Sequence, residues 1–403
     1  PDKLYSTKPT AQRLNQFAAR FRLFSVQKQT RRTRRIVLRS TTIMSQNYDV
    51  IHFEALGEEA NHLAEDTKAA QAKGELPADL RYLIVPDTLQ DWLAQHPDEV
   101  LPPLLTIKTH SRPPKEWLEG EKKSIITRSA GYDHLEALAD VANITSLRNY
   151  CVNAVAQTAI KFMYCTAGLL NQYTVNTATF ERNKTNSFME LDAHRVVTVF
   201  GVGKIGKRTY DLCVANGLTV QAVDVREKEL TKTYGGTVNF VSKEDAIKNS
   251  DIIINTMNLT RIEDSAFYNV GYFSYDYLKQ AKPGLLFINV TRGEIAPEAG
   301  LLKLYKEGVI GGIGVDVFSN EAMFSNALRE GISAENADVT AGLVMLQMAE
   351  SHTANIYVQP HQGFNSDLAA ATKAADAVAH MVEWYRNGGK CSDEQLPYYG
   401  KSL

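Results

Sequence analysis

The chain has 403 residues, of which 44% are hydrophobic and 22% charged, and its formal net charge at pH 7 is −2. This composition is typical of a globular protein with room for two domains. The near-neutral charge gives no indication of a nucleic-acid or membrane-surface partner, and no apolar run approaches the ~20 residues of a membrane span. The four cysteines show no C-x-x-C spacing, so we predict no metal site and expect a reducing compartment, with the cytoplasm as the first expectation.

Residues 1–43 differ in composition from the rest of the chain. They are rich in arginine, serine and threonine, and no acidic residue appears between Asp2 and Asp49. Two explanations are equally good. The segment resembles a transit peptide for mitochondria or plastids, or it is an untranslated upstream stretch with Met44 as the natural start. Under either explanation we expect residues 1–43 to lie outside the fold.

From residue 48 onward, short apolar runs alternate with polar, helix-favouring stretches. In the first part of the chain we predict strands at 50–53, 82–85, 104–107 and 123–126, with a helix at 58–73. This alternation is typical of a parallel sheet with helices on its faces. A long helix at 152–173 is expected to lead into a second domain.

The second part repeats the alternation. We predict strands at 196–200, 219–224, 251–256, 285–290, 312–318 and 355–359, a helix at 297–307, and a closing helix at 366–386. The predicted fold class is therefore α/β, with two domains built on parallel sheets.

The apolar run at 196–200 leads directly into the sequence GVGKIG at 201–206, a G-x-G-x-x-G pattern at the start of a helix. Gly201 allows the tight turn, Gly203 lets the backbone approach a pyrophosphate, and Gly206 lets the helix pack closely on the sheet. Asp224 follows 18 residues after Gly206, at the end of the next strand. An acid in this place binds the hydroxyls of the adenosine ribose and selects NAD over NADP, a preference that Arg226 can soften.

Three more motifs follow predicted strands, and the carboxyl ends of parallel strands converge on one crevice. Arg292 lies in NVTRGE, and its guanidinium can bind a carboxylate bidentately; a surface arginine on a turn is an equally good explanation. Asp316 and Glu321 lie five residues apart at the end of the strand predicted at 312–318, and acids in such a place are more commonly just solvated. His361 follows Pro360, and alone it is more often structural. Together, Arg292, Glu321 and His361 supply a cation, an acid and an acid–base group.

The chain resembles the D-isomer-specific 2-hydroxyacid dehydrogenase family. The motifs that carry the resemblance are GVGKIG with Asp224, NVTRGE, the segment GGIGVDVFSNE and VQPHQGF, together with TRSAGYDHLEAL in the first domain. The resemblance implies two Rossmann-like domains, one flavodoxin-like and substrate-binding, the other NAD-binding, with the cofactor in the cleft between them. It also implies a discontinuous substrate domain, formed by residues 44–150 and 362–403 around an NAD-binding domain at 151–361.

The resemblance also implies roles for individual residues. Arg292, Glu321 and His361 correspond to the catalytic triad, and Asp316 to the acid that contacts the nicotinamide carboxamide. The D-lactate dehydrogenase branch fits best, and its substrate-pocket positions match Ala130, Gly131, Tyr150 and Phe364, with Arg292 and His361. The residues expected to bind the cofactor are Gly201, Gly203, Lys204, Ile205, Gly206, Asp224, Thr256, Asn258, Thr291 and Asp316.

These features predict reversible hydride transfer between NADH and a small 2-oxo acid, with pyruvate and D-lactate as the first expectation. Other members of the family, acting on glycerate, phosphoglycerate or branched 2-oxo acids, are the alternative; a phosphorylated substrate needs basic residues in the first domain, and Arg112 and Lys115 are candidates. An NAD-sensing binding protein or corepressor on the same fold is a second alternative. By analogy with the family, we expect a homodimer formed through the cofactor domain.

Overall fold

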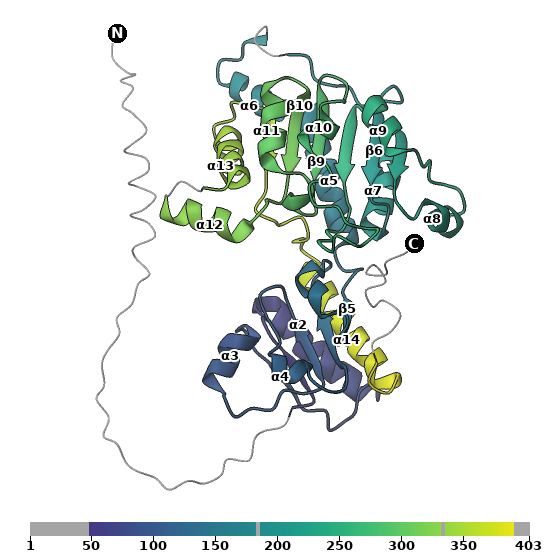
Figure 1. Ribbon diagram of the computed structural model, residues 1–403, viewed down its shortest axis with the longest axis vertical. Coiled ribbons are helices and arrows are strands. Elements are labelled where there is room, and N and C mark those ends of the chain that lie inside the picture. The colour runs from purple at the N-terminus through teal and green to yellow at the C-terminus, as the bar shows by residue number, and fades with distance from the viewer. Residues whose placement is uncertain (1–47, 183–185, 332–334, 391–403) are drawn as a thin grey trace. The chain divides into compact units, whose positions relative to one another are not determined.

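The computed structural model describes residues 48–182, 186–331 and 335–390 (Figure 1). The predictions for residues 1–43 lie outside these described residues, as do the ends of the proposed substrate domain at 44–47 and 391–403. In the described part of the chain, no helix is both long and apolar enough to cross a membrane.

The first sheet has five parallel strands in the order β2-β1-β3-β4-β5. The strands are β1 (Val50–His52), β2 (Tyr82–Ile84), β3 (Leu104–Ile107), β4 (Lys123–Thr127) and β5 (Ala142–Ser146). Because every connection is a parallel crossover, the carboxyl ends of all five strands lie at one edge of the sheet. That edge carries Lys108, Arg128 and the loop around Gly131.

Helices cover both faces of this sheet, and successive apolar residues in each strand point to opposite faces. The helices are α2 (Gly57–Ala72), α3 (Leu89–Gln95), α4 (Lys115–Leu118) and α14 (Ala369–Arg386). On one face, Val50 and Leu104 pack with α2 and α14; on the other, Ile51 and Leu105 pack with α3 and α4. Helix α14 comes from the far end of the chain and lies against α2 (Figure 1).

The second sheet has six parallel strands in the order β11-β10-β9-β8-β6-β7. They are β6 (Val196–Phe200), β7 (Thr219–Val223), β8 (Ile252–Asn255), β9 (Leu285–Asn289), β10 (Ile310–Val315) and β11 (Ile356–Val358). The chain runs from β6 to β7 on one side and then crosses back to β8 on the other side of β6. This change of direction opens a crevice at the carboxyl ends of β6 and β8, where ligands of such sheets bind.

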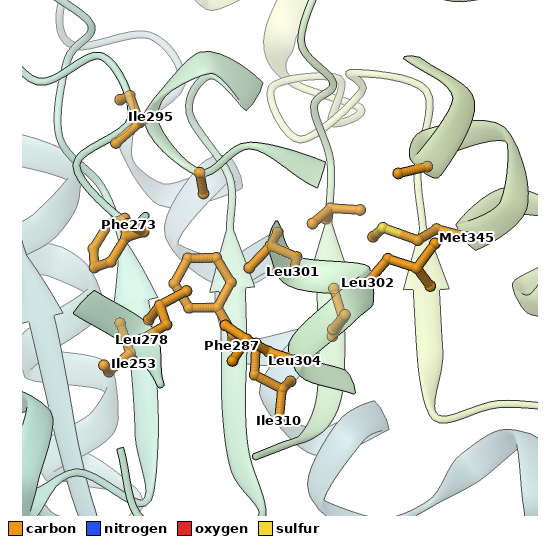
Figure 2. Packing of buried hydrophobic residues seen from close by; sticks show 14 of the residues in the cluster. Ile253, Phe273, Leu278, Phe287, Ile295, Leu301, Leu302, Leu304, Ile310 and Met345 are labelled. Atoms are coloured by element: carbon orange, nitrogen blue, oxygen red, sulfur yellow. The ribbon is translucent and has the colours of Figure 1, made fainter. Parts of the chain in front are cut away.

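The helices around the second sheet form two layers. They are α5 (Val152–Ala167), α6 (Leu170–Thr177), α7 (Lys204–Ala215), α8 (Glu227–Thr233), α9 (Lys243–Asn249), α10 (Tyr275–Leu278), α11 (Glu298–Lys306), α12 (Glu321–Glu330) and α13 (Ala337–Glu350). Figure 2 shows one of the two cores, in which Ile253 and Phe287 of the sheet meet Leu301 of α11 and Met345 of α13. On the other face, α5 and α7 pack over Ile254 and Ile288. The two buried layers hold the strand ends rigidly.

The predicted fold class is confirmed, while several predicted element boundaries are wrong. The strand β5 was not predicted; its sequence Ala-Asn-Ile-Thr-Ser mixes polar and apolar residues, and its burial comes from the neighbouring strand β4 and not from its own pattern. The helix predicted at 152–173 is two helices, because Leu169 adopts left-handed backbone (φ 50°) between α5 and α6.

Candidate active site

Two adjoining cavities lie at the carboxyl ends of the strands. The larger has a volume of about 620 Å³ and the smaller of about 290 Å³. Five residues line both of them: Ala130, Tyr132, Ile205, Met257 and Asn258. Because the two cavities share these lining residues, they form one continuous site.

The smaller cavity is built around the glycine turn. Gly201 has φ +81°, and a Cβ on Gly206 would lie 1.9 Å from the carbonyl oxygen of Gly201, so neither position tolerates a side chain. Helix α7 begins at this turn with Gly203 at its N-cap, where no side chain caps the helix. The uncapped N–H groups and the helix dipole therefore suit a pyrophosphate. The residues present fit an NAD cofactor.

Asp224 lies at the end of β7 and lines the same cavity. Its Oδ2 accepts a hydrogen bond from the N–H of Val202 at 2.7 Å, and its Oδ1 accepts one from the N–H of Arg226 at 2.9 Å. The Arg226 Nε lies 3.5 Å from Oδ1. Asp224 thus holds the glycine turn in place, and its position at the strand end is the one from which an acid reaches a ribose.

Arg292 lies just after β9, between Thr291 and the short 3₁₀ helix Gly293–Ile295, and lines the larger cavity. Its Nε and Nη2 donate to Oδ1 of Asp133 at 3.2 and 2.8 Å, and Nη1 donates to the carbonyl oxygen of Thr291 at 2.8 Å. A guanidinium has five N–H groups. One N–H on each η nitrogen is left after these three bonds, and such charged donors can bind a carboxylate.

Asp133 was not predicted as a site residue, although it lies in the motif TRSAGYDHLEAL. It also accepts a hydrogen bond from Arg261 at 3.1 Å. Burial alone would raise the pKa of Asp133, but the charges of Arg292 and Arg261 outweigh it and the pKa lies below its ordinary value. A Cβ on Gly131 would come within 2.3 Å of Nη2 of Arg292. The lack of a side chain at residue 131 therefore lets the guanidinium reach Asp133.

His361 and Glu321 form the second functional pair. The Nδ1 of His361 lies 2.9 Å from Oε2 of Glu321, and the imidazole lines the larger cavity while Glu321 does not. Glu321 begins α12, and its Oε1 accepts a hydrogen bond from the N–H of Phe318. Burial would raise the pKa of Glu321, but the hydrogen bond and charge of His361 outweigh it, so this pKa is lowered. The carboxylate of Glu321 therefore stays ionised behind the imidazole of His361.

Asp316 supports the turn that presents His361. Its carboxylate accepts hydrogen bonds from the N–H groups of Gln362 and Gly363 at 2.8 Å each, and from Nε2 of Gln359 at 3.0 Å. His361 itself has left-handed backbone, with φ 52°. Strained backbone of this kind persists only where its surroundings impose it. The hydrogen bonds that the buried Asp316 carboxylate accepts on either side of His361 hold this turn in place.

The structure brings the predicted site residues together. Gly131, Tyr150 and Phe364 line the larger cavity with Arg292, His361, Thr291 and Asp316. Gly201, Gly203, Lys204, Gly206, Asp224 and Thr256 line the smaller cavity, and Ala130, Ile205 and Asn258 line both. Thr256 Oγ1 donates to the carbonyl oxygens of Phe200 and Gly201 and so supports the turn. Neither Arg112 nor Lys115 lines either cavity. The larger cavity is instead lined by Lys108, Arg128 and Lys373 in addition to Arg292, and sequence reasoning missed these three because they are scattered along the chain.

Several known proteins are similar to this chain in sequence. Residues 163–363 match the D-isomer specific 2-hydroxyacid dehydrogenase family, NAD binding domain. A glycerate dehydrogenase of Methylorubrum extorquens is 27% identical over 195 residues, which are 47% of this chain and 57% of the relative. A glyoxylate reductase of Thermococcus onnurineus is 25% identical over 277 residues, 66% of this chain and 74% of the relative.

Solved structures show the same fold. The structure of a D-lactate dehydrogenase from Aquifex aeolicus, complexed with NAD and lactic acid, aligns over 84% of this chain and 96% of its own with a TM-score of 0.66 and 20% identity. The chain therefore belongs to the D-isomer-specific 2-hydroxyacid dehydrogenase family, and its second sheet forms an NAD-binding domain. The predicted family and the predicted cofactor, NAD, are confirmed.

Proposed function

We propose that the protein is a D-2-hydroxyacid dehydrogenase that reduces a small 2-oxo acid reversibly, with pyruvate and D-lactate as the simplest substrate pair. Bound NADH supplies the hydride. The observation that carries the proposal is that Arg292 and His361, the latter backed by Glu321, line a cavity continuous with the one around the glycine turn. Substrate and nicotinamide are thereby brought together.

Each side chain has a defined task in this reaction. The two remaining N–H groups of Arg292 bind the substrate carboxylate, in charge-assisted hydrogen bonds. Protonated His361 donates its Nε2 proton to the carbonyl oxygen during reduction, and neutral His361 takes the proton back during oxidation. Glu321 binds Nδ1 and so determines which nitrogen faces the cavity. Asp133 and Asp316 hold Arg292 and His361 in place.

The remaining assignments are part of the same proposal. Ala130, Gly131, Tyr150 and Phe364 surround the substrate, and Asp224 binds the adenosine ribose. The substrate-binding domain comprises residues 44–150 and 362–403, and the NAD-binding domain residues 151–361. The packing of α14 on α2, and of α5 on β9 and β10, supports these boundaries. We also propose a homodimer formed through the cofactor domain, by analogy with the family.

Steady-state kinetics with a panel of 2-oxo acids tests the proposal. With NADH, we expect measurable reduction of pyruvate, glyoxylate, hydroxypyruvate or 2-oxobutyrate, and almost none with His361→Ala. Calorimetric titration with NADH serves as the control for cofactor binding. If NADH binds tightly but no 2-oxo acid is reduced, the protein is an NAD-sensing binding protein and the proposed reaction is wrong.

A further inference from the structure

Four charged side chains meet at the part of the larger cavity that belongs to the first sheet. They are Glu59 of α2, Lys108 after β3, Arg128 after β4 and Lys373 of α14, and all four line the cavity. We call them the distal charge cluster. They come from four separate elements, so the fold has to bring them together. None of them takes part in the reaction proposed above.

One ion pair within the cluster is structural. The Nε of Arg128 donates to Oε1 of Glu59 at 2.9 Å, and its two η nitrogens donate to Thr106 Oγ1 and the carbonyl oxygen of Phe53. The Arg128 side chain is fully buried. Its hydrogen bonds join α2 to the sheet, and its charge is matched by Glu59.

The two lysines bring positive charge in excess of this pair. Lys108 Nζ lies 2.5 Å and Lys373 Nζ 3.8 Å from the same oxygen, Oε2 of Glu59. One carboxylate thus faces three cations. Two further acids lie nearby: Glu54 accepts N–H bonds from residues 108, 110 and 111 and does not line the cavity, and Glu58 is exposed at its margin. Excess buried charge is unfavourable unless an anion joins it.

Lys373 also touches the side chains proposed to surround the substrate. Its Nζ lies 5.0 Å from the ring centroid of Tyr150 and 4.9 Å from that of Phe364. Both Arg292 and Glu59 lie close enough to Tyr150 to influence it electrostatically. Tyr150 and Phe364, which line the same cavity as Arg292, therefore also lie beside Lys373.

We propose that the preferred substrate is a 2-oxo acid with a second anionic group at its far end, a carboxylate or a phosphate, bound by Lys373 and Lys108. This inference rests on the proposed function, since Arg292 binds the first carboxylate. Pyruvate occupies the reacting end only and leaves the distal charge cluster unmatched. A second anion neutralises the excess charge and gains charge-assisted hydrogen bonds.

The electrostatics of Lys373 agree with this assignment. Burial lowers the pKa of Lys373 most strongly. The charge of Glu59 opposes this effect, but the charges of Lys108 and Arg128 add to it, so the pKa lies below its ordinary value. A lysine in such surroundings is stabilised by any anion that approaches it.

Two substrates of equal chain length separate the effect of the second charge from the effect of substrate size. We expect kcat/KM for 2-oxoglutarate, which has a terminal carboxylate, to exceed that for 2-oxovalerate, which has none, at least tenfold. The Lys373→Met variant keeps an unbranched stem against the two rings, and it should reduce this ratio at least tenfold. Lys108→Met should reduce it as well, which keeps the test decisive if one variant folds poorly. Lys115→Met, in an exposed position that does not line the cavity, is the control and should leave the ratio unchanged.

Phosphohydroxypyruvate shows which anionic group the lysines prefer. If kcat/KM for phosphohydroxypyruvate exceeds that for 2-oxoglutarate, the second anionic group of the preferred substrate is a phosphate. If it is lower, that group is a carboxylate. Binding without turnover is measured by calorimetry of D-2-hydroxyglutarate and D-2-hydroxyvalerate with the NADH-bound enzyme. A wild-type ratio near one, or a ratio unaffected by both lysine variants, overturns the inference. Preferred binding of the dianion without reduction of any 2-oxo acid supports the anion site and overturns the proposed reaction.

Discussion

Arg292 is held by Asp133 and the backbone, and so its guanidinium has one orientation before substrate arrives. A preorganised guanidinium loses little freedom on binding, and two of its N–H groups remain for a carboxylate. Arg261 contacts the same aspartate but does not line the cavity. The two arginines therefore differ in function although they share a partner.

Replacement of Arg292 by lysine should cost about 3 kcal/mol in transition-state binding. The single ammonium of a lysine cannot bind Asp133 and the substrate carboxylate at once, as the planar guanidinium does. We expect kcat/KM for the best 2-oxo acid to fall about a hundredfold in steady-state assays. Arg261→Lys is the matched control, and its kcat/KM should fall less than fivefold. Near-full activity of Arg292→Lys would show that another cation binds the substrate carboxylate.

His361 should impose opposite pH dependences on the two directions of the reaction. Reduction needs the protonated imidazole and should decline as the pH rises, whereas oxidation needs the neutral imidazole and should improve over the same range. Glu321→Gln removes the negative charge that favours the protonated form, so the decline of reduction should move to lower pH.

The measurement is a pH–rate profile of wild type and Glu321→Gln, corrected for rate-limiting product release. NADH affinity should be nearly the same in both, because Glu321 does not line either cavity. An unshifted profile would assign the proton donor to a different residue.

At the scale of elements, the start of α11 is joined to the loop that precedes Glu321 and α12. Glu298, the first residue of α11, is buried, and its Oε1 accepts a hydrogen bond from the N–H of Ser319 at 2.7 Å. Its Oε2 has no hydrogen-bond partner among the described residues. Burial raises the pKa of Glu298 to about 7, against the hydrogen bonds with Ser319.

The raised pKa of Glu298 predicts how stability depends on pH. The folded state keeps a proton that the unfolded state releases above its ordinary pKa of 4.5. The stabilisation is therefore complete below this value and is lost as the pH rises through about 7. Glu298→Gln is neutral at every pH, so above pH 8 it should be more stable than wild type, by up to about 3 kcal/mol.

Urea unfolding between pH 5 and 9 measures this difference. The control is Glu350→Gln, in an exposed position at the end of α13, which should follow the wild-type pH dependence. Parallel profiles for Glu298→Gln and wild type would show that the carboxyl is already ionised in the folded protein.

At the scale of the whole molecule, the first domain is completed by a helix from the far end of the chain. Helix α14 packs its apolar face, including Ala377 and Met381, against α2 and the sheet. The same helix carries Lys373 into the cavity. Folding of the first domain therefore depends on residues that follow the whole second domain.

Met381→Ala should destabilise the first domain by about 2 to 4 kcal/mol, because Met381 is fully buried and its truncation leaves a cavity. Affinity for NADH should stay within about twofold, since the glycine turn lies in the other domain. Calorimetry measures both the stability and the NADH affinity. The control is Met323→Ala, because Met323 is exposed on α12 and its replacement should change stability little. A loss of NADH binding in Met381→Ala would show that the two domains unfold together.

Local pattern predicted the fold class and the order of the strands along the chain, and it singled out Arg292, Asp224 and His361 as candidates, whose roles the family resemblance implied. These features depend on neighbouring residues: alternating apolar runs make strands, and glycines between a strand and a helix allow the turn that lets the backbone approach a phosphate. Strand β5 and the break at Leu169 were missed because their local sequences are ambiguous, and only packing against neighbours resolves them.

The tertiary structure decided which side chains share the cavity. Asp133 binds an arginine 159 positions later, and Glu59, Lys108, Arg128 and Lys373 meet although they come from four elements with no common spacing. Charge–charge energies depend on distance and burial, and both are set by the topology that folds α14 back onto the first sheet. The candidate residues of the reacting end could therefore be identified from the sequence, while the cations at the far end appeared only once the chain was folded.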